Sequence, residues 1–206
     1  MKGRMFVIDG CDGAGGETQS KLLKSKLEAM GIMPVLFRYP DAETDIGRIV
    51  YEFLERRREF DVRVQFLLYS LDFVKDTGRI RKYLSEGRVV ICDRYFTSTL
   101  AYQTAQGFDM NYALEFAERF GIIKPDVVFL LKIKPETVAA RKLKEKTSLD
   151  RFESDLELQK RVARKFEELA RKNVFAKKWV VIDAEQNVEK VSNDIFERVK
   201  RELGIA

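Results

Sequence analysis

Apolar positions along the chain form two patterns that alternate. Short continuous runs of Val, Ile, Leu and Phe are typical of parallel strands that are covered on both faces. Between these runs lie longer segments in which apolar residues recur at helical spacing. The alternation predicts βαβ units and therefore an α/β fold, a five-stranded parallel sheet flanked by helices. The predicted strands are Arg4–Asp9, Val35–Arg38, Val89–Asp93, Val127–Ile133 and Trp179–Asp183.

The helical pattern is clear directly after the first strand. Leu23 and Leu27 lie on one face of the segment Thr18–Met30, and Gly31 follows where a helix would end. There is no internal repeat, low-complexity tract or linker, so we expect one domain over residues 1–206. The predicted helices are Thr18–Met30, Ile46–Arg57, Val62–Ser85, Asn111–Phe120, Pro135–Glu145, Leu156–Asn173 and Val188–Leu203.

Composition narrows the class of protein. The 206 residues are 45% hydrophobic, which is enough for a substantial core, and the net charge of +5 is spread among acidic residues. We therefore expect no nucleic-acid partner. No apolar run approaches the roughly 18 residues of a membrane span, and the first residues lack the apolar core of a signal peptide, so we expect no membrane association. Cys11 and Cys92 show no metal or disulfide spacing, which favours the cytoplasm.

The chain contains no histidine. This excludes histidine as a general base. The absence of histidine and the heavy use of Lys, Glu and Arg resemble the surface of a protein from a thermophile.

A glycine-rich segment follows the first predicted strand and precedes the first predicted helix. A strand, a glycine loop and a helix in this order bring backbone N–H groups and the positive end of the helix dipole to one point, which forms an anion site. The segment keeps the glycine spacing of the phosphate-binding frame G-x-x-x-x-G-K-[ST]. We therefore predict that nucleotide phosphates bind at Gly10, Gly13, Ala14, Gly15, Gly16, Glu17 and Thr18.

Two residues depart from this frame and remove its usual charge. Gly16 stands where the frame has a lysine that neutralises phosphate, and Glu17 stands where it has the Mg²⁺-binding hydroxyl. Glu17 is open to three interpretations. Its carboxylate could ligate Mg²⁺, could repel the nucleotide, or could pair with Lys21 one helical turn later.

Replacement charge is available in a basic stretch between Arg141 and Arg151. It contains Lys142, Lys144 and Lys146 and interrupts two predicted helices. We predict a basic lid at about residues 141–152, which would supply the phosphate charge that the glycine loop lacks.

A second polar cluster lies at the carboxyl end of the third predicted strand, where open α/β sheets bind their ligands. The Asp93 carboxylate is suited to Mg²⁺ or to one of its waters, and the Arg94 guanidinium to a bidentate phosphate clamp. A structural ion pair between Asp93 and Arg94 is the alternative. Tyr102 and Gln103 follow near the same cleft, where the Gln103 amide could read the edge of a base.

Taken in order, these segments resemble the thymidylate kinase family of P-loop nucleoside monophosphate kinases. The resemblance covers nearly the whole chain and implies the three-layer P-loop fold. It implies transfer of the γ-phosphoryl of ATP to dTMP, giving ADP and dTDP with Mg²⁺, by a homodimer in dTTP biosynthesis. The segments that carry it are Asp9–Gly15, Thr18-Gln19, Arg38–Asp41, Phe66–Tyr69, Asp93–Tyr95, Leu100–Gln103, Lys124–Asp126, Asp150–Glu153 and Val181–Ala184.

The resemblance also implies roles for individual side chains. Asp12 would contact the sugar 3′-hydroxyl, Tyr69 would stack on thymine and Tyr102 would crowd the 2′ side of the sugar. Gln103 would hydrogen-bond the base, and Arg94 would hold the acceptor phosphate against the donor. The implied catalytic residues are Asp12, Arg94, Arg141 and Arg151, the last two from the lid. The implied substrate-binding residues are Asp12, Tyr39, Tyr69, Phe73, Arg94, Tyr102 and Gln103. From the chemistry of their carboxylates, the candidate metal ligands are Asp93 and Glu17.

Two further positions depart from the pattern of this family. Ala42 and Phe73 stand where the family usually has arginines, one after the Pro-acidic pair and one four residues after the stacking aromatic. A charge-assisted hydrogen bond is worth on the order of 1.5–3 kcal/mol, so several such losses could lower turnover by decades. Lys75, Arg79 or Arg81 on the same predicted helix could compensate.

Three hypotheses follow from these matches and departures. The first is an active thymidylate kinase. The second is a catalytically impaired paralogue that binds nucleotide and acts as a regulatory or partner protein, and the third is a kinase with a shifted nucleoside monophosphate acceptor. The apolar faces of residues 62–85 and 97–106 could support a homodimer, although buried helices would show the same pattern.

Overall fold

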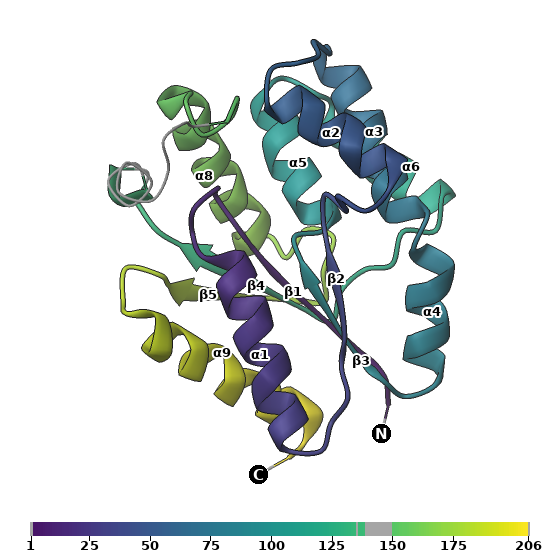
Figure 1. The fold of residues 1–206 in the computed structure, drawn as a ribbon, viewed down its shortest axis with the longest axis vertical. Helices are drawn as coiled ribbons and strands as arrows, with labels where there is room; N and C mark the ends of the chain where they lie inside the picture. Colours follow the sequence, from purple (N-terminus) through teal and green to yellow (C-terminus); the bar gives the residue numbers. More distant parts are fainter. Residues whose placement is uncertain (1, 135, 139–149, 206) are drawn as a thin grey trace.

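The computed structural model describes residues 2–134, 136–138 and 150–205. Its strands form a single parallel sheet with the order β2-β3-β1-β4-β5 (Figure 1). All five predicted strands are confirmed, with ends that agree within one residue. They are β1 (Arg4–Gly10), β2 (Val35–Arg38), β3 (Val89–Asp93), β4 (Val127–Lys132) and β5 (Lys178–Asp183).

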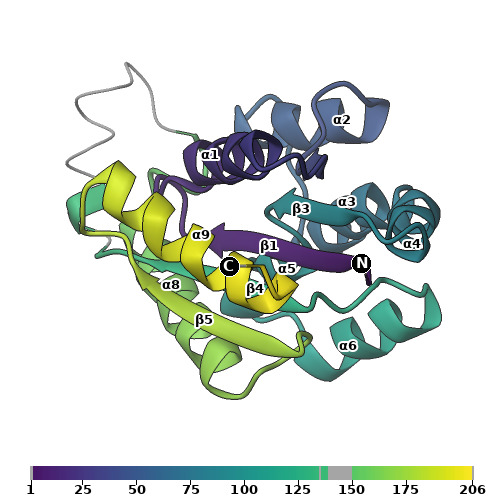
Figure 2. The same ribbon diagram turned by 90° about the horizontal axis from the view of Figure 1, so that it is seen from below.

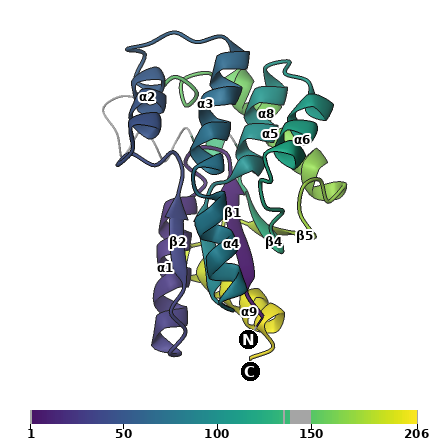
Figure 3. The same cartoon turned by 90° about the vertical axis from the view of Figure 1, so that its right-hand side faces the viewer.

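The register of the sheet brings three functional segments to one edge. Ile8 of β1 is aligned with Asp93 at the end of β3, and Asp93 is aligned with Arg38 at the end of β2. The carboxyl ends of the strands point toward α2, α3, α5 and α8, in the upper part of Figures 1 and 3. Because β1 lies between β3 and β4, the order reverses there, and a crevice forms at such a switch point.

Helices cover both faces of the sheet, as the alternating pattern predicted. One core cluster joins Phe6 and Ile8 of β1 to apolar residues of α1 and α9. The other joins Met5 and Val7 to α3, α5 and α8, and Figure 2 shows α1 and α8 on opposite sides of β1. The helices are α1 (Gly16–Ala29), α2 (Asp45–Leu54), α3 (Val62–Val74), α4 (Thr77–Ser85), α5 (Phe96–Ala105), α6 (Met110–Arg119), α8 (Leu156–Arg171) and α9 (Val188–Leu203).

Side-chain caps explain where several helices begin. Thr44, Asp61 and Asp155 each accept a backbone N–H from the first turn of α2, α3 and α8. Asn187 does the same for α9. These residues satisfy N–H groups that would otherwise have no partner within the helix.

The prediction of one helix over Val62–Ser85 was wrong, because the chain turns between α3 and α4. The Thr77 hydroxyl donates to the Phe73 carbonyl, a contact that bends helices. The buried Asp76 accepts from the Tyr39 hydroxyl at 3.2 Å and from Lys75 at 2.6 Å. Polar contacts of the buried Asp76 therefore fix the bend between α3 and α4. The spacing of apolar residues along the sequence does not reveal such contacts.

Helix α5 was not among the predicted helices. Its residues Phe96 to Gln103 are all buried, so the segment has no polar face to show helical spacing. The burial also removes residues 97–103 as a candidate dimer surface, whereas residues 104–106 are half-buried. The predicted helix over Pro135–Glu145 lies largely outside the described residues. Within the part of the chain that the structure covers, no helix is long and apolar enough to span a membrane.

Candidate active site

Two adjoining cavities open at the carboxyl edge of the sheet. A large cleft is lined by the glycine loop, from Gly10 to Thr18, and by Asp93. A smaller pocket is lined by Tyr39, Tyr69, Phe73, Tyr102 and Gln103, all of which the sequence placed at the substrate. Asp12 and Arg94 lie in the walls of both cavities. The structure therefore brings the predicted phosphate-binding and substrate-binding residues together at one edge.

The glycine loop leads into α1 with its amides uncapped. Gly15 precedes α1 in a left-handed conformation, with φ of 97°, which glycine adopts at little cost. No described side chain caps the helix there, so the N–H groups of the first turn have no side-chain partner in the part of the chain that the structure covers. Such an N-terminus attracts a phosphate through its amides and its dipole.

Gly16 lies directly beside Asp93. A Cβ atom added to Gly16 would lie 2.9 Å from Oδ1 of Asp93, so a larger residue requires that carboxylate to move. The Asp93 side chain is 8% exposed. Burial raises the pKa of Asp93 above its ordinary value. An opposing charge in the cleft would therefore stabilise its ionised form.

Glu17 is held by two cations. Its Oε1 accepts from Lys21 at 2.9 Å and from Arg38 at 2.8 Å, and its Oε2 accepts from Arg38 at 2.5 Å. The hydrogen bond from Lys21 is the main cause that lowers the pKa of Glu17, and the charge of Arg38 adds to it. The ion pair with Lys21 is thus present, together with a second partner that the sequence did not reveal. A metal-binding role for Glu17 stays a prediction.

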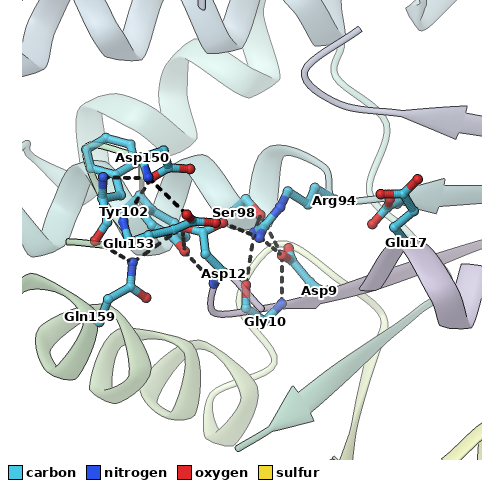
Figure 4. Close-up of polar contacts among 12 residues, drawn as sticks. Asp9, Gly10, Asp12, Glu17, Arg94, Ser98, Tyr102, Asp150, Glu153 and Gln159 are labelled. Atoms are coloured by element: carbon cyan, nitrogen blue, oxygen red, sulfur yellow. Dashed lines mark hydrogen bonds and ion pairs between the residues drawn. The ribbon is translucent and has the colours of Figure 1, made fainter. Parts of the chain in front are cut away.

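Arg94 lies between the two cavities in a strained conformation. Its φ is 61°, which is uncommon for a residue with a side chain. Its guanidinium donates to the Gly10 carbonyl at 2.9 Å and to Asp12 at 2.5 Å (Figure 4). Asp9 lies 3.9 Å away. Arg94 therefore pairs with Asp9 and Asp12 and not with Asp93, so the structural Asp93–Arg94 pair is wrong.

Asp12 is the centre of a hydrogen-bond network. The Tyr102 hydroxyl donates to Oδ2 of Asp12 at 2.6 Å. Gln159 of α8 donates to the same oxygen at 3.3 Å and to the Phe152 carbonyl at 3.0 Å. The sequence analysis missed Gln159, because no motif surrounds it and its contact with Asp12 joins positions 147 apart.

Asp9 is a second residue to which the sequence analysis assigned no role of its own. It is 1% exposed and accepts hydrogen bonds from Thr97 at 2.6 Å and Ser98 at 2.5 Å. Burial raises the pKa of Asp9 to about 6, although the charge of Arg94 acts in the opposite direction. Asp9 thus joins the end of β1 to the start of α5 beneath the glycine loop.

The smaller pocket contains an unpartnered amide. Gln103 is 1% exposed, and neither atom of its amide has a hydrogen-bond partner among the described residues. Thr99 also has a buried hydroxyl with no described partner. Buried polar groups are normally paired, so both groups are available to a ligand in this pocket.

Phe73 forms part of the pocket wall and of the core. Its ring packs edge-on against Tyr39 at 4.8 Å and against Tyr95 at 5.2 Å, measured between ring centroids. Phe73 is 2% exposed. An apolar ring thus occupies the position at which the family usually has an arginine.

None of the three candidate compensating cations lines either cavity. Lys75 is held by Asp41 at 3.2 Å, by Asp72 at 3.0 Å and by Asp76 at 2.6 Å. Arg79 also pairs with Asp76, at 2.8 Å. Arg81 donates to the Gly121 carbonyl instead. The replacement of arginine by Ala42 and Phe73 is therefore not offset by Lys75, Arg79 or Arg81.

The described end of the predicted lid is attached to α2. Arg151 donates to Glu59 at 2.6 Å and to the Phe53 carbonyl at 2.9 Å, and its guanidinium lies over the Phe53 ring. Its neighbours Asp150 and Phe152 line the smaller pocket, whereas Arg151 does not. Arg141 and the rest of the lid up to residue 149 lie outside the described residues.

A strand, a glycine loop and a helix beside a pocket lined by aromatic side chains define a P-loop nucleotide-binding protein. The family model for thymidylate kinase matches residues 8–195. The chain belongs to the thymidylate kinase family, which confirms the resemblance and the P-loop fold inferred from the sequence.

Individual relatives match over nearly their full lengths. A probable thymidylate kinase of Pyrococcus horikoshii is 34% identical, with 98% of both chains covered. One of Methanocaldococcus jannaschii is 36% identical, over 97% of this chain and 98% of the relative. The thymidylate kinase of Danio rerio is 29% identical, over 100% of this chain and 93% of the relative. The archaeal relatives fit the thermophile-like composition.

Proposed function

We propose that the protein transfers the γ-phosphoryl group of ATP to dTMP, giving ADP and dTDP. The observation that carries this proposal is the meeting of two cavities at Asp12 and Arg94. Phosphoryl transfer asks a protein mainly to position two nucleotides in line and to neutralise charge. The glycine-loop cleft suits the donor and the aromatic pocket suits the acceptor. Membership of the thymidylate kinase family supports the same assignment.

Each proposed role follows from the position of the side chain. Arg94 lies at the junction of the cavities, where its guanidinium can hold the acceptor phosphate in place of its present bonds to Asp12 and Gly10. The Gln103 amide is buried and unpartnered in the acceptor pocket, so it suits the polar edge of thymine. The Tyr69 ring lines the same pocket and suits the face of the base.

Mg²⁺ is proposed as the metal that accompanies ATP. Asp93 fits this ion, since its carboxylate lines the donor cleft beside Gly16 and offers hard oxygen ligands. When bound with ATP, Mg²⁺ neutralises charge on the phosphates. Asp93 would hold the ion or its water at the loop, while backbone N–H groups of α1 orient the phosphate chain.

The test is a coupled assay of ADP formation with ATP, Mg²⁺ and a panel of nucleoside monophosphates. We expect turnover with dTMP that Arg94→Ala lowers at least 100-fold. Arg119→Ala is the matched control, because Arg119 is exposed on α6 and pairs only with Glu115 among the described residues. Wild-type turnover no faster than that of Arg94→Ala would indicate the impaired paralogue, and preference for another monophosphate would indicate a shifted acceptor.

A homodimer is proposed through the exposed face of α3. Val64, Leu67 and Leu71 lie on one side of this helix and are 37%, 52% and 48% exposed. Exposed apolar side chains that cluster in this way are typical of protein interfaces. Sedimentation should show a dimer that Leu67→Lys dissociates, and a wild-type monomer at micromolar concentration would contradict the proposal.

The cytoplasm is the proposed location. Cys11 and Cys92 are free and buried, which fits a reducing compartment. Fractionation of cells that express a tagged chain would test this location.

A further inference from the structure

The donor cleft has an unusual balance of charge for a polyphosphate site. Arg38 and Arg94 are the cations among the described residues that line it. Arg94 donates to Asp12 and to the Gly10 carbonyl, toward the acceptor pocket. Arg38 is therefore the described cation of the cleft that is not committed to the acceptor side. The carboxylates that line the cleft are Asp9, Asp12, Glu17, Asp93, Asp150 and Glu153.

Arg38 stands at the edge of the glycine loop. It ends β2, and the register of the sheet places it opposite Asp93. Its guanidinium donates to both oxygens of Glu17, and its Nε lies 3.8 Å from Oδ2 of Asp93. Glu17 follows Gly16 in the first turn of α1, and the other Asp93 oxygen lies 2.9 Å from the Cβ position of Gly16. The guanidinium thus contacts the two carboxylates that flank the missing lysine.

We propose that Arg38 supplies, from the neighbouring strand, the positive charge that a lysine at position 16 would give to the donor phosphates. The proposal rests on the proposed function, which makes a nucleoside triphosphate the donor. It assigns Glu17 the role of holding the Arg38 side chain beside the loop. Arg38 binds the β- and γ-phosphates by donating hydrogen bonds from its guanidinium group to their oxygens.

The chemistry of arginine suits this position. The guanidinium carries five N–H donors in a rigid fork, and Glu17 accepts from two of its nitrogens. The Arg38 side chain is 52% exposed, so it can turn toward a ligand without disturbing the packing of the core. An exposed ion pair contributes little to stability, and a phosphate in the cleft can therefore compete with Glu17 for the same side chain.

The first test compares two variants, each of which lacks one of the two cations that pair with Glu17. Arg38→Gln should lower kcat/KM for ATP at least 10-fold and leave KM for dTMP within twofold of wild type. Lys21→Gln is the matched control, because Lys21 also pairs with Glu17 but does not line the cleft. Its kcat/KM for ATP should stay within threefold of wild type. Equal losses in the two variants, or unchanged kinetics in Arg38→Gln, would overturn the proposal.

The second test asks whether charge beside the loop is what Arg38 provides. Gly16→Lys in the Arg38→Gln background should restore at least 10-fold in kcat/KM for ATP, and Arg38→Lys should keep most of the wild-type value. The same Gly16→Lys change should raise the wild-type value by a smaller factor. Gly16→Lys also displaces the Asp93 carboxylate, whereas Arg38→Lys leaves it in place, so the Arg38→Lys result decides. A loss of kcat/KM for ATP in Arg38→Lys as large as that in Arg38→Gln would contradict the proposal.

A binding measurement separates this proposal from the proposed function. Calorimetry with a non-hydrolysable ATP analogue and Mg²⁺ requires no turnover and no acceptor. Arg38→Gln should weaken this binding at least 10-fold, while Lys21→Gln should leave it within threefold. If the wild-type protein phosphorylates no monophosphate, the proposed function fails and these affinities still decide the role of Arg38. Equal affinity of wild type and Arg38→Gln would overturn that role.

Discussion

Tyr102 and Asp12 are joined by two hydrogen bonds through one hydroxyl group. The Tyr102 hydroxyl donates to Oδ2 of Asp12 at 2.6 Å and accepts the Asp12 backbone N–H at 3.0 Å. A single phenol therefore fixes both the side chain and the backbone of a residue in the glycine loop. The contact orients Asp12 between the donor cleft and the acceptor pocket.

Tyr102→Phe tests this contact. The variant leaves the Asp12 N–H and carboxylate without that partner, so we expect the free energy of unfolding to fall by about 1–3 kcal/mol. KM for dTMP should rise roughly 10-fold, because Asp12 loses its orientation. Urea unfolding and the coupled assay measure the two effects. Tyr112→Phe, at an exposed tyrosine of α6, is the control, and equal behaviour of the two variants would exclude the positioning role.

Asp9 gives the stability a defined dependence on pH. Burial raises the pKa of Asp9 to about 6 in the folded protein, above its ordinary value of 3.8. Between these two values the native state binds more protons than the unfolded chain, so the free energy of unfolding falls as pH rises. The contribution is present below about pH 4 and is lost as pH passes through 6.

Comparison with Asp9→Asn isolates this contribution, since the other titrating groups are shared. Urea unfolding from pH 4 to pH 7 should show wild type losing on the order of 2–3 kcal/mol relative to the variant. A constant difference between the two proteins across this range would show that Asp9 has the same pKa in both states.

We expect the Gln103 amide to lower the stability of the unliganded protein and to strengthen the binding of dTMP. Its amide is buried without a described partner, which costs free energy in the unliganded protein. Gln103→Leu should therefore raise the free energy of unfolding by about 1–2 kcal/mol and raise KM for dTMP at least 10-fold. Thermal unfolding with and without dTMP measures both effects. A variant that is less stable without ligand, or that keeps the wild-type KM, would contradict this assignment.

Local patterns were sufficient to predict much of the fold and the loop. The strands are apolar because helices cover both faces, and the glycine loop directly follows one of them, so adjacency along the chain identified both. Asp93 and Arg94 were found for the same reason. The ends of strands in a parallel sheet meet at one edge whatever the order of the strands.

Contacts that depend on the order of the elements could not be predicted in this way. The strand β3 lies between β2 and β1 and aligns Arg38 with Asp93. This order places Arg38 beside the glycine loop, where it contacts Glu17. Gln159 reaches Asp12 from α8 across 147 positions. The break before Thr77 depends on contacts of Asp76 with Tyr39. Each is a polar contact between distant segments, and hydrophobic spacing carries no information about such contacts.

The Arg151→Ala variant tests whether Arg151, at the described end of the lid, acts on binding of the acceptor or on the phosphoryl group that is transferred. Its guanidinium bonds to Glu59 and to the Phe53 carbonyl, and so holds Asp150 and Phe152 in the pocket wall. We expect Arg151→Ala to raise KM for dTMP roughly 10-fold, to lower kcat less than threefold and to reduce the free energy of unfolding by about 1–2 kcal/mol.

Glu59→Gln provides the comparison, because it removes the charged partner and leaves Arg151 in place. If Arg151 acts by anchoring the pocket wall, Glu59→Gln should reproduce part of the rise in KM, and the double variant should add little to Arg151→Ala. The catalytic role implied by the family resemblance has a different signature. In that case Arg151→Ala would lower kcat by decades at constant KM, and Glu59→Gln would leave kcat unchanged.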